Sequence, residues 1–274
     1  MAKALLLFVL SAFLTGSAVA QTSGSVSLSN QRFDLVDLDL NDGVAPSLVF
    51  FLEPLAEPSS TRIIGAPHNR AWYVNDHDHA ARAFDNVASS IAVDFGSGSA
   101  SVEAGPAWQL DLHAAASVHP ARAAFNAIDA QALACGLNFI LSPMTTVTFR
   151  TDVTTHASTV EQRASSDYSR SRLHAGIAVY PVPFEFDAPW WKAVDWNAVN
   201  GQELRDAAIL ELTISNPLGM TQDYRLELNV SMDVLAQAAA VPEPSAWAML
   251  LAGLVLFGYT ARARHGAMAA RTTS

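Results

Sequence analysis

Hydrophobic and polar residues alternate with a period of two along much of the chain. The clearest stretch is "YRLELNVSMDVLAQ" (224–237), in which apolar residues occupy every second position. They are Leu226, Leu228, Val230, Met232 and Val234, separated by Arg225, Glu227, Asn229, Ser231 and Asp233. Because successive side chains of a β-strand point to opposite faces, this pattern predicts a strand with one buried and one exposed face.

The segment "ILELTISN" (209–216) repeats the pattern, with Leu210, Leu212 and Ile214 on the face expected to be buried. The residues "NPLGMTQD" (216–223) between the two segments are typical of a turn. We therefore expect the two strands to pair as a hairpin.

Further short strands are predicted where apolar runs are bounded by Gly, Pro, Asn and Ser. In "TTVTFRTDV" (145–153), Val147, Phe149, Thr151 and Val153 share one face. The other predicted strands are 33–40, 47–53, 90–95, 137–142 and 173–182. Many short strands separated by turns indicate an all-β fold, a β-sandwich or jelly-roll-like domain over residues 21–236.

Two segments have less regular patterns. The alanine-rich stretch 120–134 has good helix propensity, but we interpret it as mostly strand. The stretch "APWWKAVDWNAVNGQEL" (188–204) is expected to be an irregular loop or a short helix.

The N-terminus has the three parts of a secretory signal peptide, predicted over residues 1–20. Lys3 supplies the positive start, residues 4–14 are apolar, and Ala18 and Ala20 form an A-x-A cleavage site. The mature chain is expected to begin near Gln21, outside the cytoplasm.

The C-terminal region contains an uncharged stretch, residues 245–261, followed by Arg262 and Arg264. As an α-helix this stretch would be about 26 Å long, near the lower limit for crossing a hydrocarbon core of about 30 Å. Basic residues after such a helix favour a cytoplasmic tail. We predict a transmembrane helix at 245–261, preceded by a linker at 237–241 and followed by a disordered tail at 267–274.

The residues Val241, Pro242, Glu243 and Pro244 come directly before this helix. This tetrapeptide, the apolar stretch and the following arginines together resemble a PEP-CTERM sorting signal, which would occupy residues 242–266. The resemblance implies recognition by an exosortase-type processing enzyme in a Gram-negative bacterium that makes exopolysaccharide. It also implies passage through the secretion translocon, transient anchoring in the inner membrane, and delivery to the cell surface or extracellular matrix.

The charge of the chain excludes one class of function, nucleic-acid binding. The formal net charge is -10, from 16 basic and 26 acidic residues. Four of the basic residues and one acid lie outside residues 21–241, which keep 12 basic and 25 acidic residues. An acidic domain is unsuited to nucleic acid, whose phosphates require basic contacts.

The single cysteine, Cys135, allows no internal disulfide and is expected to be a buried apolar residue.

Two clusters are candidate metal sites. Asp37, Asp39 and Asn41 provide alternating oxygen ligands that suit calcium, but an EF-hand would need Gly and Glu where Asp42 and Leu48 stand. The alternative is a turn that follows a strand.

His77 and His79 would share one face of a strand and could hold a metal ion together with a neighbouring aspartate. The alternative is a solvated polar loop.

Trp190, Trp191 and Trp196 are candidates for a platform on which sugar rings stack, with packing in the core as the alternative. We find no sequence motif for a catalytic nucleophile, a zinc protease or a phosphate-binding loop. The predicted function is therefore an exported, non-catalytic surface or matrix protein that needs no cofactor. The alternatives are a secreted polysaccharide-active enzyme and a calcium- or carbohydrate-binding module.

Overall fold

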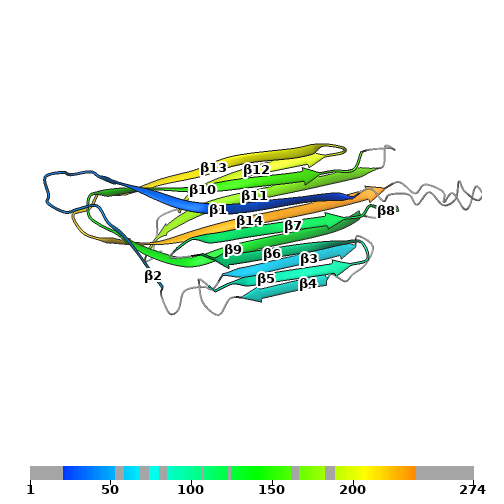
Figure 1. Cartoon of the computed structure of the whole chain (residues 1–274), viewed down its shortest axis with the longest axis horizontal. Coiled ribbons are helices and arrows are strands. Elements are labelled where there is room, and N and C mark those ends of the chain that lie inside the picture. The colour runs from blue at the N-terminus through cyan, green and yellow to red at the C-terminus, as the bar shows by residue number, and fades with distance from the viewer. Residues whose placement is uncertain are drawn as a thin grey trace, which may run out of the picture. The chain divides into compact units, whose positions relative to one another are not determined.

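The structure is a computed structural model that describes residues 21–52, 59–67, 74–79, 85–105, 108–122, 125–161, 167–182 and 189–238. These residues form fourteen β-strands, and none of them lies in a helix (Figure 1). The prediction of an all-β fold is therefore confirmed. Contacts divide the chain into residues 1–238 and residues 239–274, and the fold described below is that of the first unit.

Six strands form the first sheet, in the spatial order β13-β10-β1-β7-β6-β5, and all neighbours are antiparallel. Their bounds are β1 (Thr22–Asp37), β5 (Val87–Val93), β6 (Gly96–Ala104), β7 (Leu110–Val118), β10 (Thr145–Ser158) and β13 (Glu203–Asn216).

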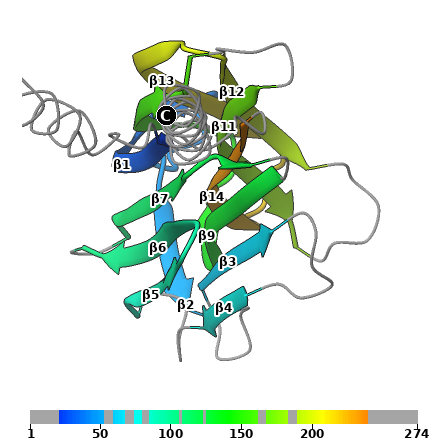
Figure 2. The same ribbon diagram turned by 90° about the vertical axis from the view of Figure 1, so that its right-hand side faces the viewer.

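Eight strands form the second sheet, in the order β12-β11-β14-β9-β3-β4, with β2 beside β9 and β8 beside β14. Their bounds are β2 (Leu48–Leu52), β3 (Ser60–Pro67), β4 (Val74–His79), β8 (Ala121–Arg122), β9 (Phe125–Leu141), β11 (Tyr168–Pro181), β12 (Trp190–Val199) and β14 (Gln222–Ala238). The two sheets lie face to face as the layers of a sandwich (Figure 2).

The chain changes sheet repeatedly along its C-terminal half. Strand β13 pairs with β10 in the first sheet, whereas β14 pairs with β11 in the second. The predicted hairpin between residues 209–216 and 224–237 is therefore wrong. The turn between them carries the chain from one sheet to the other, so the apolar sides of β13 and β14 both face the interior from opposite layers.

Side chains predicted to point inward do form the core. Leu210, Leu212 and Ile214 of β13 are buried, as are the apolar residues of β14 from Leu226 to Val234. Phe139 of β9 is fully buried, and its ring lies 5.2 Å from that of Phe149 and 5.3 Å from that of Tyr224 between ring centroids. Aromatic contacts at these distances stabilise a core beyond the area that they bury.

A β-bulge in β1 reverses which residues of that strand face inward. The register against β10 shifts between Ser29 and Arg32, and Asn30 has a φ of 55°. Before the bulge Val26 and Leu28 are buried, whereas after it Gln31 is buried. A bulge adds one residue to one strand of a pair, so the inward positions change from even to odd numbers. This change conceals the period of two, and residues 22–32 were not expected to be a strand.

The two less regular segments are both strands where the structure describes them. Residues 125–141 form β9, which agrees with the strand interpretation of 120–134. The expectation of a loop or short helix at 188–204 is wrong, because β12 covers residues 190–199 and β13 begins at Glu203. Asn200 and Gly201 form the turn between them with positive φ angles of 42° and 86°.

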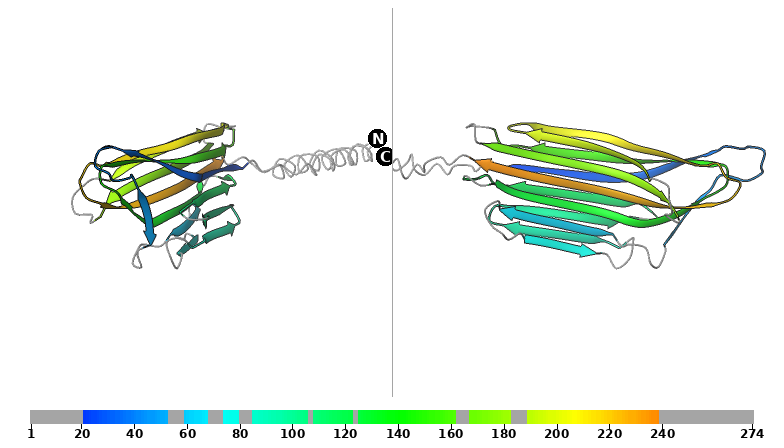
Figure 3. Two further views of the ribbon diagram at one scale, coloured as in Figure 1. Left: turned by 60° about the vertical axis from the view of Figure 1, so that its left-hand side comes forward. Right: turned by 180° about the vertical axis from the view of Figure 1, so that it is seen from behind.

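The first and last strands of the sandwich end beside each other (Figure 3). The backbone N–H of Val160 donates to Thr22 Oγ1 at 3.4 Å, and Ser169 Oγ donates to the carbonyl of Val160 at 2.8 Å. Ser169 in turn faces Ala236 of β14. The described buried core extends from Val26 to Ala236, and all of it lies in the contact unit that ends at Ala238, so residues 21–238 can be tested without the C-terminal unit.

Truncation of Phe139 tests this description of the core. We expect Phe139→Ala to lower the free energy of unfolding of residues 21–238 by about 3–5 kcal/mol, because it leaves a cavity among buried aromatic rings. Chemical denaturation followed by tryptophan fluorescence measures the change. The control Met220→Ala removes a side chain that is 65% exposed, and it should change stability by less than about 0.5 kcal/mol. Equal effects of the two variants would contradict the described core.

Candidate functional site

The outer face of the second sheet carries side chains in rows that cross β12, β11 and β14. The rows are Trp191, Ala178 and Glu227; Ala193, Gly176 and Asn229; Asp195, His174 and Ser231; and Asn197, Arg172 and Asp233. Same-face residues of a strand are two positions apart, so neighbouring rows are separated by about 6.6 Å and the four rows span about 20 Å.

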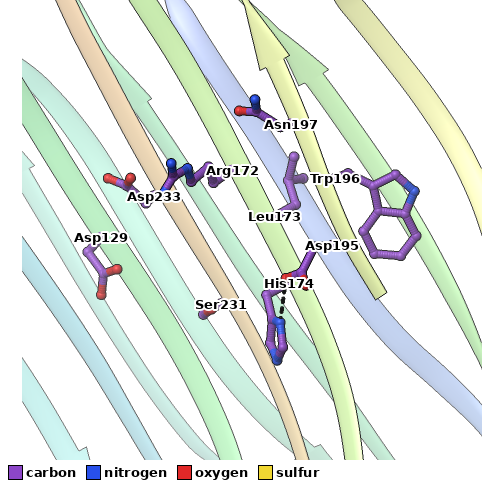
Figure 4. A pocket seen from close by; sticks show the side chains of 9 residues that line it. All are labelled: Asp129, Arg172, Leu173, His174, Asp195, Trp196, Asn197, Ser231 and Asp233. Carbon is purple, nitrogen blue, oxygen red and sulfur yellow. Dashed lines mark hydrogen bonds and ion pairs between the residues drawn. The ribbon is translucent and has the colours of Figure 1, made fainter. Parts of the chain in front are cut away.

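Two adjoining hollows follow these rows. The larger has a volume of about 660 Å³ and lies over the polar rows, extending to Asp129 of β9 (Figure 4). The smaller has a volume of about 150 Å³ and lies over Gly176, Ala178 and Ala193, beside Trp191 and Tyr180. His174 lines both hollows. We refer to the two hollows together, from Asp129 to Trp191, as the β11 groove.

His174 occupies the centre of the β11 groove and is oriented by Asp195. Its Nδ1 lies 2.7 Å from Asp195 Oδ1 (Figure 4). A neutral imidazole that donates its Nδ1–H to a carboxylate keeps Nε2 as an acceptor. The contact thus leaves Nε2 of the ring and the remaining lone pairs of the carboxylate for a ligand.

Gly176 has no side chain, and the side chains of its neighbours extend into the space above it. A Cβ atom at this position would lie 2.4 Å from Asn229 Oδ1 and 3.2 Å from His174 Nε2. The first distance is shorter than any normal contact. A side chain at position 176 would therefore displace the Asn229 amide from its present place. His174 Nε2 and the amide of Asn229 consequently lie close together above the floor.

Carboxylates line the opposite end of the groove. Asp233 Oδ2 accepts a hydrogen bond from Arg170 Nη2 at 2.6 Å. Burial raises the pKa of Asp129, the nearby Asp233 carboxylate raises it further, and Arg62 opposes both effects. A carboxyl group with a raised pKa keeps its proton to higher pH than an exposed one.

The three predicted tryptophans do not share one face of the sheet. Trp196 is buried and donates its Nε1–H to Asp206 Oδ2 at 2.7 Å. Trp190 contacts Tyr224 edge to face, with ring centroids 6.1 Å apart. Trp191 lines the smaller hollow, whereas the buried Trp196 borders the larger one, because residues an odd number of positions apart in a strand lie on opposite faces.

His77 and His79 do share a face of β4, as predicted, with ring centroids 4.2 Å apart. Both are exposed. Asp76 Oδ2 accepts the backbone N–H of Ser90, and Asp78 Oδ1 accepts that of His79. The two neighbouring carboxylates thus bond to backbone groups.

The acidic residues after β1 also bond to the backbone. Asp37 Oδ1 accepts the N–H of Asp39, and Asp39 Oδ1 accepts that of Asn41. The N–H of Asp42 donates to the carbonyl of Asp39, closing a turn. This geometry is that of the predicted alternative, a turn after a strand. Across the described ranges, no three His, Cys, Asp or Glu side chains are grouped so that they could hold a metal ion.

The central residues of the β11 groove were not predicted as site residues. The polar positions of β14 were recognised as its exposed face, but His174, Asp195 and Asp129 were not singled out. Alternating polar residues in "RSRLHAG" (170–176) are the signal that could have indicated them. Strand pairing, which the pattern does not reveal, brings these positions together with β12 and β14.

The predicted signal-cleavage residues Ala18 and Ala20 lie outside the described residues, as do Val241, Pro242, Glu243 and Pro244. Arg262, Arg264 and the helix predicted at 245–261 do so too. The residues that the structure describes include no apolar helix of membrane-spanning length.

Comparison with known proteins identifies the C-terminal segment. Residues 240–264 match the PEP-CTERM protein-sorting motif, which confirms the resemblance noted in the sequence. No curated protein matches the chain. The motif indicates an exported protein that is anchored at its C-terminus and sorted through an exosortase-type partner.

The raised pKa of Asp129 predicts a pH-dependent gain in stability for Asp129→Asn. The folded protein holds this proton more tightly than the unfolded chain, so its contribution to stability is lost as pH rises from 3.8 through the folded-state pKa. We expect the variant to have a higher free energy of unfolding than the wild type at pH 7 and no advantage at pH 3. Asp111→Asn, on the exposed face of the first sheet, controls for the lost charge. A variant that is less stable than the wild type at pH 7 would contradict the pKa direction.

Replacing Trp196 and Trp191 in turn tests which ring is structural. We expect Trp196→Phe to lower the free energy of unfolding by about 1–3 kcal/mol, because it removes buried ring contacts and the donor to Asp206. Trp191→Phe should change it by less than about 0.5 kcal/mol. Urea denaturation of both variants measures the difference, and the reverse order would show that Trp191 carries the packing role.

Proposed function

We propose that this chain is an exported, non-catalytic protein of the cell surface or extracellular matrix. The match of residues 240–264 to the PEP-CTERM protein-sorting motif carries the proposal. In it, residues 1–20 direct export, residues 245–261 hold the chain in the inner membrane, and an exosortase-type enzyme removes the tail. The β-sandwich then remains outside a Gram-negative cell that produces exopolysaccharide.

Two features of the sandwich support this role. The start of β1, at Thr22, lies beside the end of β14. Its acidic composition also favours solubility over adsorption to nucleic acid or anionic surfaces. Both features suit a domain that is displayed from one attachment point.

Mass spectrometry of the native protein tests the sorting proposal. The full chain is produced in an exosortase-containing host and in the same host without that enzyme. We expect the N-terminus to lie near Gln21 in both, and the tail to be absent only when the enzyme is present. Glu243→Ala should retain the tail, because it removes the acid between the two prolines of the motif. The matched control Glu103→Ala changes an exposed acid of β6 and should be processed normally. An intact tail in wild-type protein from the exosortase-containing host would overturn the proposal.

The raised pKa of Asp129, beside Asp233 in the β11 groove, favours one alternative function, a secreted enzyme acting on polysaccharide. Glycoside hydrolysis uses one carboxyl group that keeps its proton and a second that is ionised. A reducing-sugar assay on soluble polysaccharides distinguishes the alternatives. Hydrolysis that is lost in both Asp129→Asn and Asp233→Asn would replace the non-catalytic proposal, whereas no release of reducing ends supports it.

A further inference from the structure

We propose that the β11 groove binds a segment of neutral polysaccharide chain, with one sugar ring resting on Trp191 and its neighbours lying over His174 and Asp195. This inference deepens the proposed surface or matrix function, and rests on it for the presence of polysaccharide around the protein. It assigns the ligand contacts to β11, β12 and β14, and not to the cluster of three tryptophans.

The shape of the groove suits a linear chain of rings. The two hollows adjoin at His174 and follow β11 over about 20 Å from the row of Arg172 to that of Ala178. Their floor at the aromatic end consists of Gly176, Ala178 and Ala193, whose small side chains leave room for a bulky ring. An extended ligand can therefore enter and leave at the two ends without a deep pocket.

The aromatic end has the composition that sugar rings need. Trp191 is 69% exposed although it is one of the largest apolar side chains. An exposed indole presents a flat apolar face, and the C–H groups on one face of a pyranose ring pack against such a surface. Tyr180 lines the same hollow, and burial raises its pKa, with a further contribution from Glu227. It therefore stays a neutral phenol at physiological pH.

The polar end combines donors and acceptors, which matches hydroxyl groups that both donate and accept. Asp195 accepts hydrogen bonds, Arg172 donates, the amides of Asn229 and Asn197 do both, and His174 Nε2 accepts in the neutral ring that donates Nδ1–H to Asp195. The Asp195–His174 contact at 2.7 Å holds two of these groups in place before a ligand binds. Groups held in place in this way lose less conformational entropy on binding.

The charges of the groove favour a neutral ligand. The groove carries the acids Asp129, Asp195, Asp233 and Glu227 and the bases Arg172 and Lys192, with Arg170 paired to Asp233. Among the side chains that line the two hollows the acids outnumber the bases by four to two, so an acidic polysaccharide or a nucleic acid would meet more like charge than a neutral chain does. A peptide that adds a strand would bind along a sheet edge, whereas β11 and β14 lie inside the sheet.

A glycan-binding assay on residues 21–238 tests the inference. An array of neutral oligosaccharides is screened first, and calorimetry then measures the affinity of the glycans that bind. An anionic alginate oligosaccharide serves as the charged comparison. We expect neutral glycans to bind and alginate not to bind. Trp191→Ala should weaken binding about tenfold or more, because it removes the stacking surface. Ala193→Leu should weaken it similarly, because it fills the smaller hollow while every polar group stays in place.

Two variants on the opposite sheet serve as matched controls. Ile209→Ala removes an apolar side chain that is 59% exposed, and Asp111→Asn removes an exposed carboxylate. Both should bind as the wild type does, and circular dichroism checks that every variant is folded. The inference is overturned if no neutral glycan binds, if only alginate binds, or if Trp191→Ala and Ala193→Leu bind as tightly as the controls. This assay uses residues 21–238 without the tail, so its failure is distinct from a failure of C-terminal processing.

Discussion

Burial of every second side chain between two sheets determines the register of the strands and, through it, the outer surface. Leu226, Leu228, Val230, Met232 and Val234 of β14 all face the interior. A slip of one residue in the pairing of β14 would expose this whole set to water. At about 25 cal/mol per Å² of apolar surface, such a slip is far more costly than any single contact on the outer face. The register of β14 against β11 is therefore fixed from within.

The β11 groove is the outward consequence of that register. Once Leu173 and Ala175 point inward, His174 must point outward, and pairing places it opposite Asp195 and Ser231. The core thus determines which polar groups meet outside it. The same relation explains why Trp196 is buried and Trp191 exposed, since their positions along β12 differ by five, an odd number.

The alternation of apolar and polar residues predicted well which side chains are buried, but poorly which strands pair. Val147, Phe149 and Val153 of β10 are buried as expected, because the period of two depends only on the residues themselves. The hairpin between β13 and β14 was wrongly predicted, because a turn sequence does not reveal which sheet the next strand joins. Strand β12 was missed because two exposed tryptophans in succession, Trp190 and Trp191, conceal its alternation. The His174–Asp195 pair could not be predicted, because it depends on the pairing of two separate strands.

Hydroxyl-radical footprinting of protein recovered from outside the cells, read by mass spectrometry, examines both the fold and the delivery of the protein. A two-layered sandwich that is delivered to the exterior with the β11 groove exposed predicts rapid oxidation of Trp191, slow oxidation of Trp196, and no peptides from residues 245–274. Equal oxidation of the two tryptophans, or recovery of the C-terminal peptides in full yield, would contradict it.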